Sequence, residues 1–451
     1  FLFIIINMGT KLYIKTFGCQ MNEYDSQKTA EILQNKKDME ITTNVEEADI
    51  ILLNTCSIRE KAEDKVYSEL GRLNKLKIKN PNIKIGVGGC VATQEGSNIT
   101  KRAPYVDLIY GPQTLHRVAD LLDEDNKLKA IDITFPIEEK FDSLPEPTAT
   151  SPSSFVAIME GCSKYCSFCV VPYTRGDEVS RKAQQIFDEI ARLVEQGSSE
   201  IVFIGQNVNS YKQVHDGRTL RLSDLIDIAS NINGVERIRF TTSHPLDMTD
   251  DLIEIFGSVP QLANQLHLPV QSGSDRVLKA MKRNYTADSY RDIIERVKKI
   301  RPTIKVTSDF IVGFPGETHA EFMQTMQLIE DIQFDSSFSF IFSPRPGTPA
   351  SILQDDISKS EKKERLNILQ ARLNEIQRGF GQKMVGSIQR CLVTGISKKR
   401  LDQLQARTEC NRVINFPFQN IGFIGKLVDI KVEEALAYSL LGTLHNTKEL
   451  V

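Results

Sequence analysis

Three cysteines in the middle of the chain are spaced in a way that suits an iron–sulfur cluster. Cys162, Cys166 and Cys169 are separated by three and then two residues, and they follow an apolar run typical of a β-strand. Three thiolates on one loop can hold three irons of a 4Fe–4S cube and leave the fourth iron open for a small molecule. Zinc is more usually held by paired CxxC ligands, so a zinc knuckle, or three buried thiols, is the alternative. The spacing therefore predicts a cluster with one open iron.

Three further cysteines, Cys19, Cys56 and Cys90, are far apart in the sequence but share a local context. Each lies just past the end of a predicted strand. In a parallel sheet such ends meet at one edge, where ligands bind, and helix N-termini after Cys19 and Cys56 favour thiolate over thiol. Taken alone, the chemistry leaves two readings open: a second cluster with an open iron, or unrelated buried cysteines.

The first part of the chain alternates strand-like and helix-like segments. We predict strands at 12–16, 50–54, 83–87 and 108–110, and helices at 24–34, 57–74 and 115–122. Ser57 and Glu60 fit a capping box at the start of the second helix. This alternation predicts an α/β domain with a parallel sheet covered by helices. Prolines and polar residues between 127 and 153 suit an exposed linker.

The middle of the chain repeats the same alternation six times. The predicted strands are 155–159, 201–205, 237–241, 265–269, 305–312 and 336–343, with helices at 183–196, 222–232, 288–300 and 319–332. A long charged helix at 359–380 follows. Six such units predict a (β/α)6-type partial barrel, with its chemistry at the carboxyl ends of the strands.

After Gly381 the pattern changes to short strand-like runs at 386–393, 427–432 and 439–444, which predicts a small antiparallel β-barrel. Between Lys383 and Lys431 there are nine basic and three acidic residues, a net charge of +6 in a chain whose net charge is -3. Such a local excess is what contacts with phosphates require. A solvated basic face without a partner is the alternative.

These segments divide the 451 residues into five parts. We expect an extension at 1–9, the α/β domain at 10–127, a linker at 128–147, the partial barrel at 148–380 and the small barrel at 383–446. The apolar run Phe1–Ile6 is too short to cross a bilayer and lacks the flanks of a signal peptide, so we expect the natural start at Met8 and a cytoplasmic protein. In that compartment clustered cysteines indicate metal or redox chemistry and not disulfides.

The loop of Cys162, Cys166 and Cys169 resembles that of the radical S-adenosylmethionine (radical SAM) superfamily. From residue 11 to about residue 444 the chain resembles the methylthiotransferase family within it. The matching stretches are Gly18–Asn22, Asn54–Lys61, Gly86–Gln94, Met159–Arg181, Leu268–Asp275, Asp309–Thr318 and Arg345–Pro349. Parts of two of these stretches, Cys56–Lys61 and Val170–Gly176, are similar to the MiaB branch, which acts on tRNA.

The resemblance implies a reaction and its cofactors. A member of this branch converts N6-isopentenyladenosine at position 37, in the tRNA anticodon stem-loop, to its 2-methylthio form. It uses two 4Fe–4S clusters, here on Cys19, Cys56 and Cys90 and on Cys162, Cys166 and Cys169. One S-adenosylmethionine methylates sulfur held at the first cluster, and a second is cleaved at the other cluster to a radical that removes hydrogen from the adenine ring. We also expect a monomer, an electron-donor reductase and no membrane.

Other residues are candidates for contacts with cofactor or RNA. Those near S-adenosylmethionine are Phe168, Gly205, Gln206, Gln271, Ser272, Asp309 and Gly313. The alternative for them is structural, as turn glycines or a cap. The small barrel resembles the TRAM domain, which binds RNA, and the candidate RNA contacts are Lys398, Lys399, Arg400, Arg407, Arg412 and Arg175. Arg175 could instead pair with Asp177 or Glu178, and we interpret Cys391 and Cys410 as structural.

Two other functions are compatible with these patterns. One is a sister methylthiotransferase that acts on threonylcarbamoyladenosine of tRNA or on an aspartate of a ribosomal protein, which a comparison of modified nucleosides would separate. The other is a noncatalytic iron–sulfur protein that binds RNA or relays electrons. It would release no 5′-deoxyadenosine when given reductant and S-adenosylmethionine.

Overall fold

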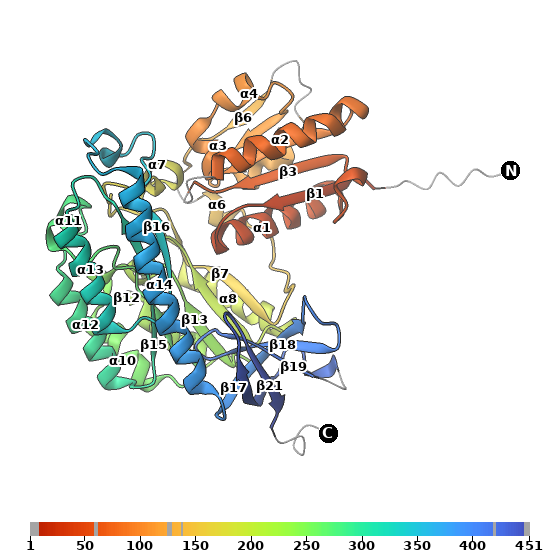
Figure 1. Ribbon diagram of the computed structural model, residues 1–451. Helices are drawn as coiled ribbons and strands as arrows, with labels where there is room; N and C mark the ends of the chain where they lie inside the picture. The colour runs from red at the N-terminus through yellow and green to blue at the C-terminus, as the bar shows by residue number, and fades with distance from the viewer. Residues whose placement is uncertain (1–8, 58–61, 124–128, 137–138, 418–420, 446–451) are drawn as a thin grey trace. The chain divides into compact units, whose positions relative to one another are not determined.

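The computed structural model describes residues 9–57, 62–123, 129–136, 139–417 and 421–445 (Figure 1). The chain forms two units, which we describe separately. The first contains the residues up to Thr148 together with 160–163 and 169–181, and the second contains 149–159, 164–168 and the rest. The predicted extension before Met8 and the last three residues of the predicted capping box at Ser57 lie outside the described residues.

The first unit is built on a parallel sheet, as predicted. Its six strands follow the order β2-β1-β3-β4-β5-β6. They are β1 (Lys11–Thr16), β2 (Glu40–Ile41), β3 (Ile50–Thr55), β4 (Lys84–Gly89), β5 (Leu108–Tyr110) and β6 (Ala130–Asp132). The helices are α1 (Gln20–Lys37), α2 (Ala62–Lys79), α3 (Cys90–Glu95), α4 (Asn98–Arg102), α5 (Val118–Asp123), α6 (Glu139–Asp142) and α7 (Val171–Arg175). All six residues of β3 are buried, as expected of a central parallel strand covered on both faces.

The segment that we predicted to be an exposed linker contains two ordered pieces. Strand β6 extends the sheet by pairing Leu108 with Ala130, so its backbone groups are hydrogen-bonded. In α6 the side chains of Lys140 and Phe141 are buried. Composition misled the prediction, because the buried charge of Lys140 is compensated by carboxylates that are distant in the sequence.

The second unit begins with the predicted (β/α)6-type partial barrel, made of two three-stranded parallel sheets in the orders β13-β10-β7 and β14-β15-β16. The strands are β7 (Ser153–Ala157), β10 (Glu200–Ile204), β13 (Arg237–Phe240), β14 (Gln265–His267), β15 (Lys305–Val312) and β16 (Ser336–Ile341). An isolated bridge between Ile238 and Leu262 links β13 to the chain ahead of β14. The sheets lie edge to edge without closing, which makes the barrel partial.

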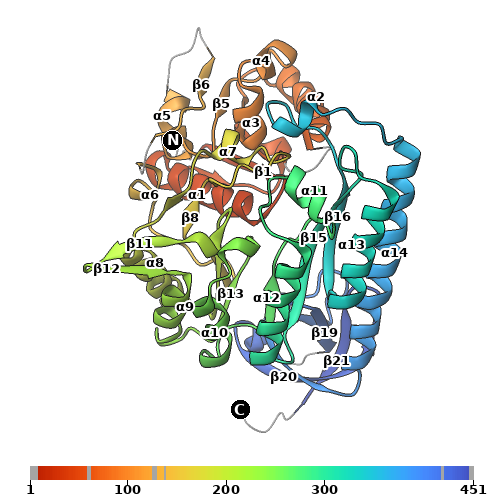
Figure 2. The same ribbon diagram turned by 90° about the vertical axis from the view of Figure 1, so that its left-hand side faces the viewer.

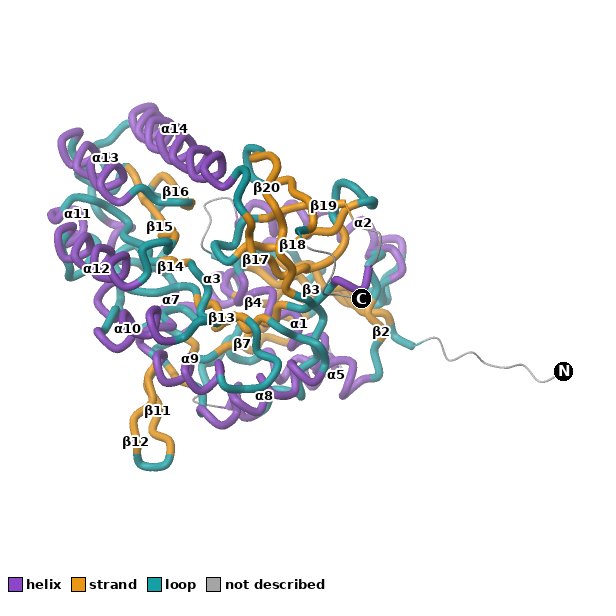
Figure 3. The backbone as a smooth tube through the Cα atoms, turned by 90° about the horizontal axis from the view of Figure 1, so that it is seen from below, coloured by secondary structure: helices purple, strands orange, loops and turns teal. Residues whose placement is uncertain are grey.

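Helices cover the outer face of these strands (Figure 2). They are α8 (Ala183–Glu195), α9 (Leu222–Ser230), α10 (Asp250–Ser258), α11 (Asp275–Ala280), α12 (Ala287–Ile300), α13 (His319–Ile332) and α14 (Lys359–Met384). Helix α14 packs along β16. A hairpin of β11 (Lys212–His215) and β12 (Arg218–Arg221), which we did not predict, projects from the unit in Figures 2 and 3. Its turn residues, Asp216 and Gly217, have the positive φ angles of a tight hairpin turn.

The C-terminal strands of this unit close into the predicted small barrel, in the order β17-β18-β19-β21-β20. They are β17 (Ile388–Ile396), β18 (Gln403–Thr408), β19 (Val413–Pro417), β20 (Leu427–Ala435) and β21 (Leu440–Leu444). Four of its strand pairs are antiparallel, as predicted, whereas β19 and β21 pair in parallel. Five strands cannot alternate in direction around a closed ring, so one pair must be parallel. Cys391 and Cys410 lie in the core of this barrel.

We find no helix in the described part of the chain that is both long enough and apolar enough to cross a membrane.

Candidate cluster and cofactor sites

Cys19, Cys56 and Cys90 all lie at the carboxyl ends of adjacent strands. Cys19 follows β1 and precedes the first turn of α1, Cys56 comes directly after β3, and Cys90 begins α3 after β4. Because β1, β3 and β4 are neighbours in one parallel sheet, their ends share one edge. The predicted strand-end positions of the three cysteines are therefore present in the structure.

Two glycines let the chain around these cysteines pack closely. Gly18 has φ +126°, and a Cβ atom there would lie 2.4 Å from the Cβ atom of Cys56. Gly89 has φ +91°, and a Cβ atom there would lie 2.3 Å from the carbonyl oxygen of Thr55. Any side chain at either position would push the loop away from the end of β3. The glycines before Cys19 and Cys90 thus hold these two cysteines beside Cys56.

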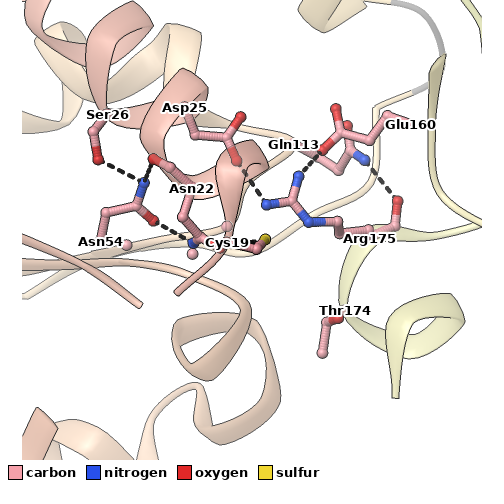
Figure 4. A network of polar contacts seen from close by, with 12 residues as sticks. Cys19, Asn22, Asp25, Ser26, Asn54, Gln113, Glu160, Thr174 and Arg175 are labelled. Atoms are coloured by element: carbon pink, nitrogen blue, oxygen red, sulfur yellow. Dashed lines mark hydrogen bonds and ion pairs between the residues drawn. The ribbon is translucent and has the colours of Figure 1, made fainter. Parts of the chain in front are cut away.

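Two buried asparagines fasten α1 to β3 beside the cysteines (Figure 4). Asn22 donates through its side-chain amide to Asn54 Oδ1 at 3.1 Å and to the carbonyl oxygen of Thr55 at 2.9 Å. Asn54 donates to the carbonyl oxygen of Asn22 at 2.8 Å and to Ser26 Oγ at 2.9 Å. The thiol of Cys19 donates to Asn22 Oδ1 at 3.3 Å. These bonds fix the position of Cys19 relative to the end of β3.

Four buried charged residues form a closed ring in the same unit. Arg175 donates to Asp25 Oδ2 at 2.7 Å and to Glu160 Oε1 at 2.5 Å, as Figure 4 shows. Lys140 contacts the other oxygen of each carboxylate, Asp25 Oδ1 at 3.0 Å and Glu160 Oε2 at 2.6 Å. The four side chains are at most 4% exposed. Two cations and two anions balance, which is the condition under which charges are tolerated in a protein interior.

The positive charge of Arg175 lies close enough to Cys19 and Cys90 to affect the pKa of each thiol. A hydrogen bond with Cys56, together with the nearby charge of Arg175, lowers the pKa of the Cys19 thiol to about 6, despite burial. Burial raises the pKa of Cys90, and Arg175 opposes that rise. Thiolates are the ligands of iron–sulfur clusters, and a positive neighbour favours the thiolate form. The donor set and its charge environment therefore fit a cluster.

The second set of cysteines is divided between the units. Cys162 and Cys169 belong to the first unit, in which the amide of Cys162 donates to the carbonyl oxygen of Gly176 at 3.1 Å. Cys166 belongs to the second unit and is buried. Among the described residues no three cysteine, histidine or acidic side chains are gathered closely enough to hold a metal ion. The cluster-ligand roles of both sets therefore stay predictions.

Phe168 lies in the second unit with Cys166. Its ring packs against a cluster that includes Val277, Phe314 and Phe342, and it is half-buried. A contact with the adenine of S-adenosylmethionine stays a prediction for the part of the ring that is exposed.

Most of the other predicted cofactor contacts lie at strand ends of the second unit. Gly205 and Gln206 follow β10, where a Cβ atom on Gly205 would lie 2.5 Å from Met159 Sδ. The backbone of Gln271 pairs with β15, donating to the carbonyl oxygen of Asp309 at 2.9 Å. The structure therefore brings Gln271 and Asp309 together. A contact of these residues with a cofactor stays a prediction.

The remaining three candidates have local structural partners. Ser272 is buried, with its hydroxyl 3.4 Å from that of Thr325. The carboxylate of Asp309 lies 3.7 Å from His267 Nε2, while its buried Oδ1 has no hydrogen-bond partner among the described residues. Gly313 has φ +68° and donates its amide to Glu317 Oε2 at 2.7 Å. Asp309 is thus the one of the three with an unsatisfied polar atom available to a ligand.

The predicted RNA contacts separate into exposed and inward-facing side chains. Lys398, Lys399 and Arg400 are exposed between β17 and β18, and Arg400 pairs with Asp402 at 3.0 Å. Arg407 is half-buried and donates to Asn411 Oδ1 at 3.0 Å.

Arg412 and Arg175 bind other parts of the chain. Arg412 donates to Asp335 Oδ1 at 2.7 Å, and its side chain is 12% exposed. The predicted contact of Arg175 with RNA is not supported, because its guanidinium is buried between Asp25 and Glu160. Its partners are not the Asp177 or Glu178 that the sequence suggested, because the fold brings two distant carboxylates closer.

Several residues around the first cysteine set were not predicted from the sequence. Asn22, Asn54 and Glu160 lie inside the motif stretches, and their position within those stretches was the available signal. Asp25 is on the helix that follows Cys19, and Lys140 is in the segment taken for a linker, so neither had a local signal of a role.

Three family matches cover the parts of the chain just described. Residues 11–111 match the Uncharacterized protein family UPF0004, residues 156–329 match the Radical SAM superfamily, and residues 382–445 match the TRAM domain. Fold and matches together define a three-domain radical SAM protein with a C-terminal TRAM barrel.

Two curated relatives narrow the class. The chain is 55% identical over 438 residues to a protein of Hahella chejuensis, covering 96% of this chain and 98% of that protein. It is 54% identical over 442 residues to a protein of Pseudomonas savastanoi pv. phaseolicola, covering 97% and 100%. Both are named tRNA-2-methylthio-N(6)-dimethylallyladenosine synthase. The chain belongs to the family of these synthases.

Solved structures support the fold alone. The radical S-adenosylmethionine methyltransferase TsrM from Kitasatospora setae, with cobalamin and a [4Fe-4S] cluster bound, is 12% identical with a TM-score of 0.57, covering 76% of this chain and 77% of that one. The cobalamin-dependent radical enzyme OxsB is 14% identical with a TM-score of 0.53, covering 82% of this chain and 58% of that one. The likeness extends beyond the partial barrel, since each covers about three quarters or more of this chain.

Proposed function

We propose that this chain transfers a methylthio group to C2 of N6-isopentenyladenosine at position 37 of tRNA. It is a radical SAM methylthiotransferase that uses S-adenosylmethionine and 4Fe–4S clusters. The observation that carries the substrate assignment is identity of 54–55% across nearly the whole length of both relatives. Neither sister activity has comparable support, because both relatives are named for the dimethylallyladenosine product.

The proposal assigns separate tasks to the two sets of cysteines. Cys19, Cys56 and Cys90 would hold the cluster that carries the sulfur, and Cys162, Cys166 and Cys169 would hold the cluster that binds S-adenosylmethionine for cleavage. When bound, these groups supply sulfur and a radical able to remove hydrogen from a ring carbon, whose C–H bond is too weakly acidic for a general base. The chain holds the thiolates in place: Asn22 and Asn54 fix Cys19, and Arg175 favours its ionised form.

The proposed partners follow from the same assignment. The exposed basic group of Lys398, Lys399 and Arg400 would contact phosphates of the anticodon stem-loop. A reductase would supply electrons to the clusters, and the enzyme would act as a monomer. A tRNA substrate would place the activity in the cytoplasm.

Nucleoside analysis tests the proposal. Total tRNA from cells that carry or lack the gene is digested and the modified adenosines are measured by mass spectrometry. We expect 2-methylthio-N6-isopentenyladenosine to disappear and its unmethylthiolated precursor to accumulate when the gene is absent. Unchanged amounts of both, or loss of the methylthio form of threonylcarbamoyladenosine instead, would contradict the substrate assignment.

A further inference from the structure

Arg283 is a buried cation that lies in a tight bend of the backbone. It lies after α11 in the second unit and is 6% exposed. The residues on either side, Lys282 and Asn284, both have φ +57°, in the left-handed region that side chains seldom adopt. Hydrogen bonds from the amides of Lys282 and Arg283 to the end of α11 maintain this bend. Such paired disfavoured conformations persist only where the surrounding structure imposes them.

The guanidinium of Arg283 makes three polar contacts, and one of them is to a cysteine predicted to bind a cluster. It donates to Cys166 Sγ at 3.5 Å, to the carbonyl oxygen of Pro269 at 2.7 Å and, through Nε, to Tyr285 Oη at 2.9 Å. Tyr285 in turn donates to the carbonyl oxygen of Val270 at 2.8 Å. One N–H group of the guanidinium therefore points at the sulfur of Cys166, and the other donors bind neutral oxygen atoms of Pro269 and Tyr285.

No carboxylate among the described residues forms an ion pair with Arg283. His244, whose ring lies 5.6 Å from that of Tyr285, has its pKa lowered to about 2, mainly by burial, so it contributes no charge near neutral pH. An arginine guanidinium stays protonated in proteins, so Arg283 carries its positive charge in this buried position. A buried charge without a counter-charge is costly. Of the three groups that the guanidinium contacts, Cys166 is the one that would be an anion as the ligand of a cluster.

The same turn also fixes the backbone beside Cys166. Ser167 donates its amide to the carbonyl oxygen of Met281 at 3.0 Å and its hydroxyl to that of Ala280 at 2.8 Å. Its carbonyl oxygen accepts from the amide of Ala350 at 2.8 Å. The residue that follows Cys166 is therefore hydrogen-bonded to the same short segment, residues 280–283, that contains Arg283.

We propose that Arg283 is a positioning residue that donates to the thiolate of Cys166 and makes the cluster bound there easier to reduce. The inference rests on the proposed function only in that Cys162, Cys166 and Cys169 hold a cluster. A cluster gains negative charge when it is reduced, and a fixed cation with an N–H group directed at a ligand sulfur stabilises the reduced state. Arg283 thus acts through Cys166 and does not itself contact the substrate.

The test measures the midpoint potential of this cluster by redox titration followed by electron paramagnetic resonance. The full-length chain carries alanine at Cys19, Cys56 and Cys90, so that one cluster contributes to the signal. We expect Arg283→Met to make one-electron reduction at least tenfold less favourable, a shift of about 59 mV to more negative potential. Arg283→Lys keeps the positive charge but not the planar guanidinium, so its midpoint potential should shift less. The midpoint potential of Tyr285→Phe should also become more negative.

A matched control is Arg301→Met. Arg301 also donates to backbone carbonyl oxygens of the second unit, those of Leu262 and Val259, but not to a cysteine. The cluster in the Arg301→Met variant should therefore have the same midpoint potential as the cluster in the parent. If Arg283→Met does not retain iron, the midpoint potential is measured in Arg283→Lys and Arg283→Gln instead. A midpoint potential equal to that of the parent in both variants would overturn the proposal. Absence of a cluster in the parent itself would instead overturn the proposed function, so the two failures are distinct.

Discussion

At the residue scale, the two sets of cysteines have different polar neighbours. Cys19 is bonded to Asn22 and lies near Arg175, whose charge is balanced by Asp25 and Glu160. Cys166 faces a guanidinium that has no carboxylate partner among the described residues. A positive charge that is already balanced stabilises a neighbouring anion less than an unbalanced one does. The two sites should therefore respond differently to loss of one cysteine or one arginine.

Replacement of single cysteines should separate the two halves of the reaction. Cys166→Ala should abolish release of 5′-deoxyadenosine, because one of the three predicted ligands of the cleavage site is lost. Cys56→Ala should abolish methylthio transfer and leave 5′-deoxyadenosine release within about twofold of the parent, because Cys56 is not among the predicted ligands of the cleavage cluster. Both products are measured by liquid chromatography with mass spectrometry. Methylthiolated tRNA from Cys56→Ala would show that Cys56 has no role in sulfur transfer.

Arg175→Met should strongly destabilise the first unit. The change leaves Asp25 and Glu160 with only Lys140 as a buried counter-charge, and breaking such a pair costs about 3–5 kcal/mol. The free energy of unfolding is measured with denaturant. Lys36→Met, at a solvent-exposed pair with Asp120 in the same unit, should change it by less than about 0.5 kcal/mol.

A second variant checks that the Arg175 effect comes from the charge ring. Asp25→Asn combined with Arg175→Met should cost less than the sum of the single changes, because the two residues interact directly. Strict additivity would mean that the loss reflects packing alone.

At the element scale, one carboxylate joins two helices of the second unit. Glu321 is at the third position of α13 and accepts from the amide and the hydroxyl of Thr318, each at 2.8 Å, completing a capping box. It also accepts from Arg276 of α11, at 2.7 Å for one of the two bonds. The hydrogen bond from Arg276 and those from Thr318 lower the pKa of Glu321 to about 2. The ionised carboxylate therefore stabilises both the start of α13 and its connection to α11.

Glu321→Gln should remove a pH-dependent part of the stability. Because the folded-state pKa is below the ordinary value of about 4.3, the contribution is fully present above that pH and is lost as pH falls towards 2. The variant should be less stable than the parent at pH 7, and the difference should shrink between pH 4.3 and 2. Denaturant unfolding at several pH values measures it. A difference that is constant across this range would show that the carboxylate charge is not responsible.

At the scale of the whole chain, the TRAM barrel is fastened to the partial barrel within the second unit. Arg237 and Arg239 on β13 donate to backbone carbonyl oxygens of the small barrel, including that of Thr408 at 2.8 Å from Arg239. Arg412 donates in the opposite direction, to Asp335. These arginines are used for attachment, whereas Lys398, Lys399 and Arg400, in the turn between β17 and β18, are exposed.

Lys398→Ala combined with Lys399→Ala should weaken tRNA binding and make it less sensitive to salt. Each lost phosphate contact reduces the slope of log K against log[salt] by about 0.7–0.9, so the double variant should lose roughly 1.5. Binding is measured by filter retention at several salt concentrations. Lys359→Ala with Lys363→Ala, two exposed lysines of α14, is the control and should leave the slope unchanged. An equal loss in both double variants would place the RNA contacts elsewhere.

Local patterns were sufficient to predict much of this protein. The spacing of Cys162, Cys166 and Cys169, the strand ends at Cys19, Cys56 and Cys90 and the six-fold strand–helix alternation are properties of short stretches. Their physical basis, hydrophobic periodicity and ligand spacing, acts over a few residues. The predicted parallel sheet, partial barrel and small barrel therefore agree with the structure, apart from the parallel pair β19–β21 and the buried pieces of the linker.

Only the tertiary structure decided which charges are buried and with whom they pair. Residues 25, 140, 160 and 175 form one ring, and Arg283 meets Cys166, although more than a hundred residues separate the last two. Arg175 and Arg412 have the same sequence appearance as exposed basic residues, yet both are held by carboxylates within the chain. The burial and the ion-pair partners of a charged side chain depend on segments that are distant in the sequence. Hydrophobic periodicity and ligand spacing, in contrast, can be recognised within one short segment.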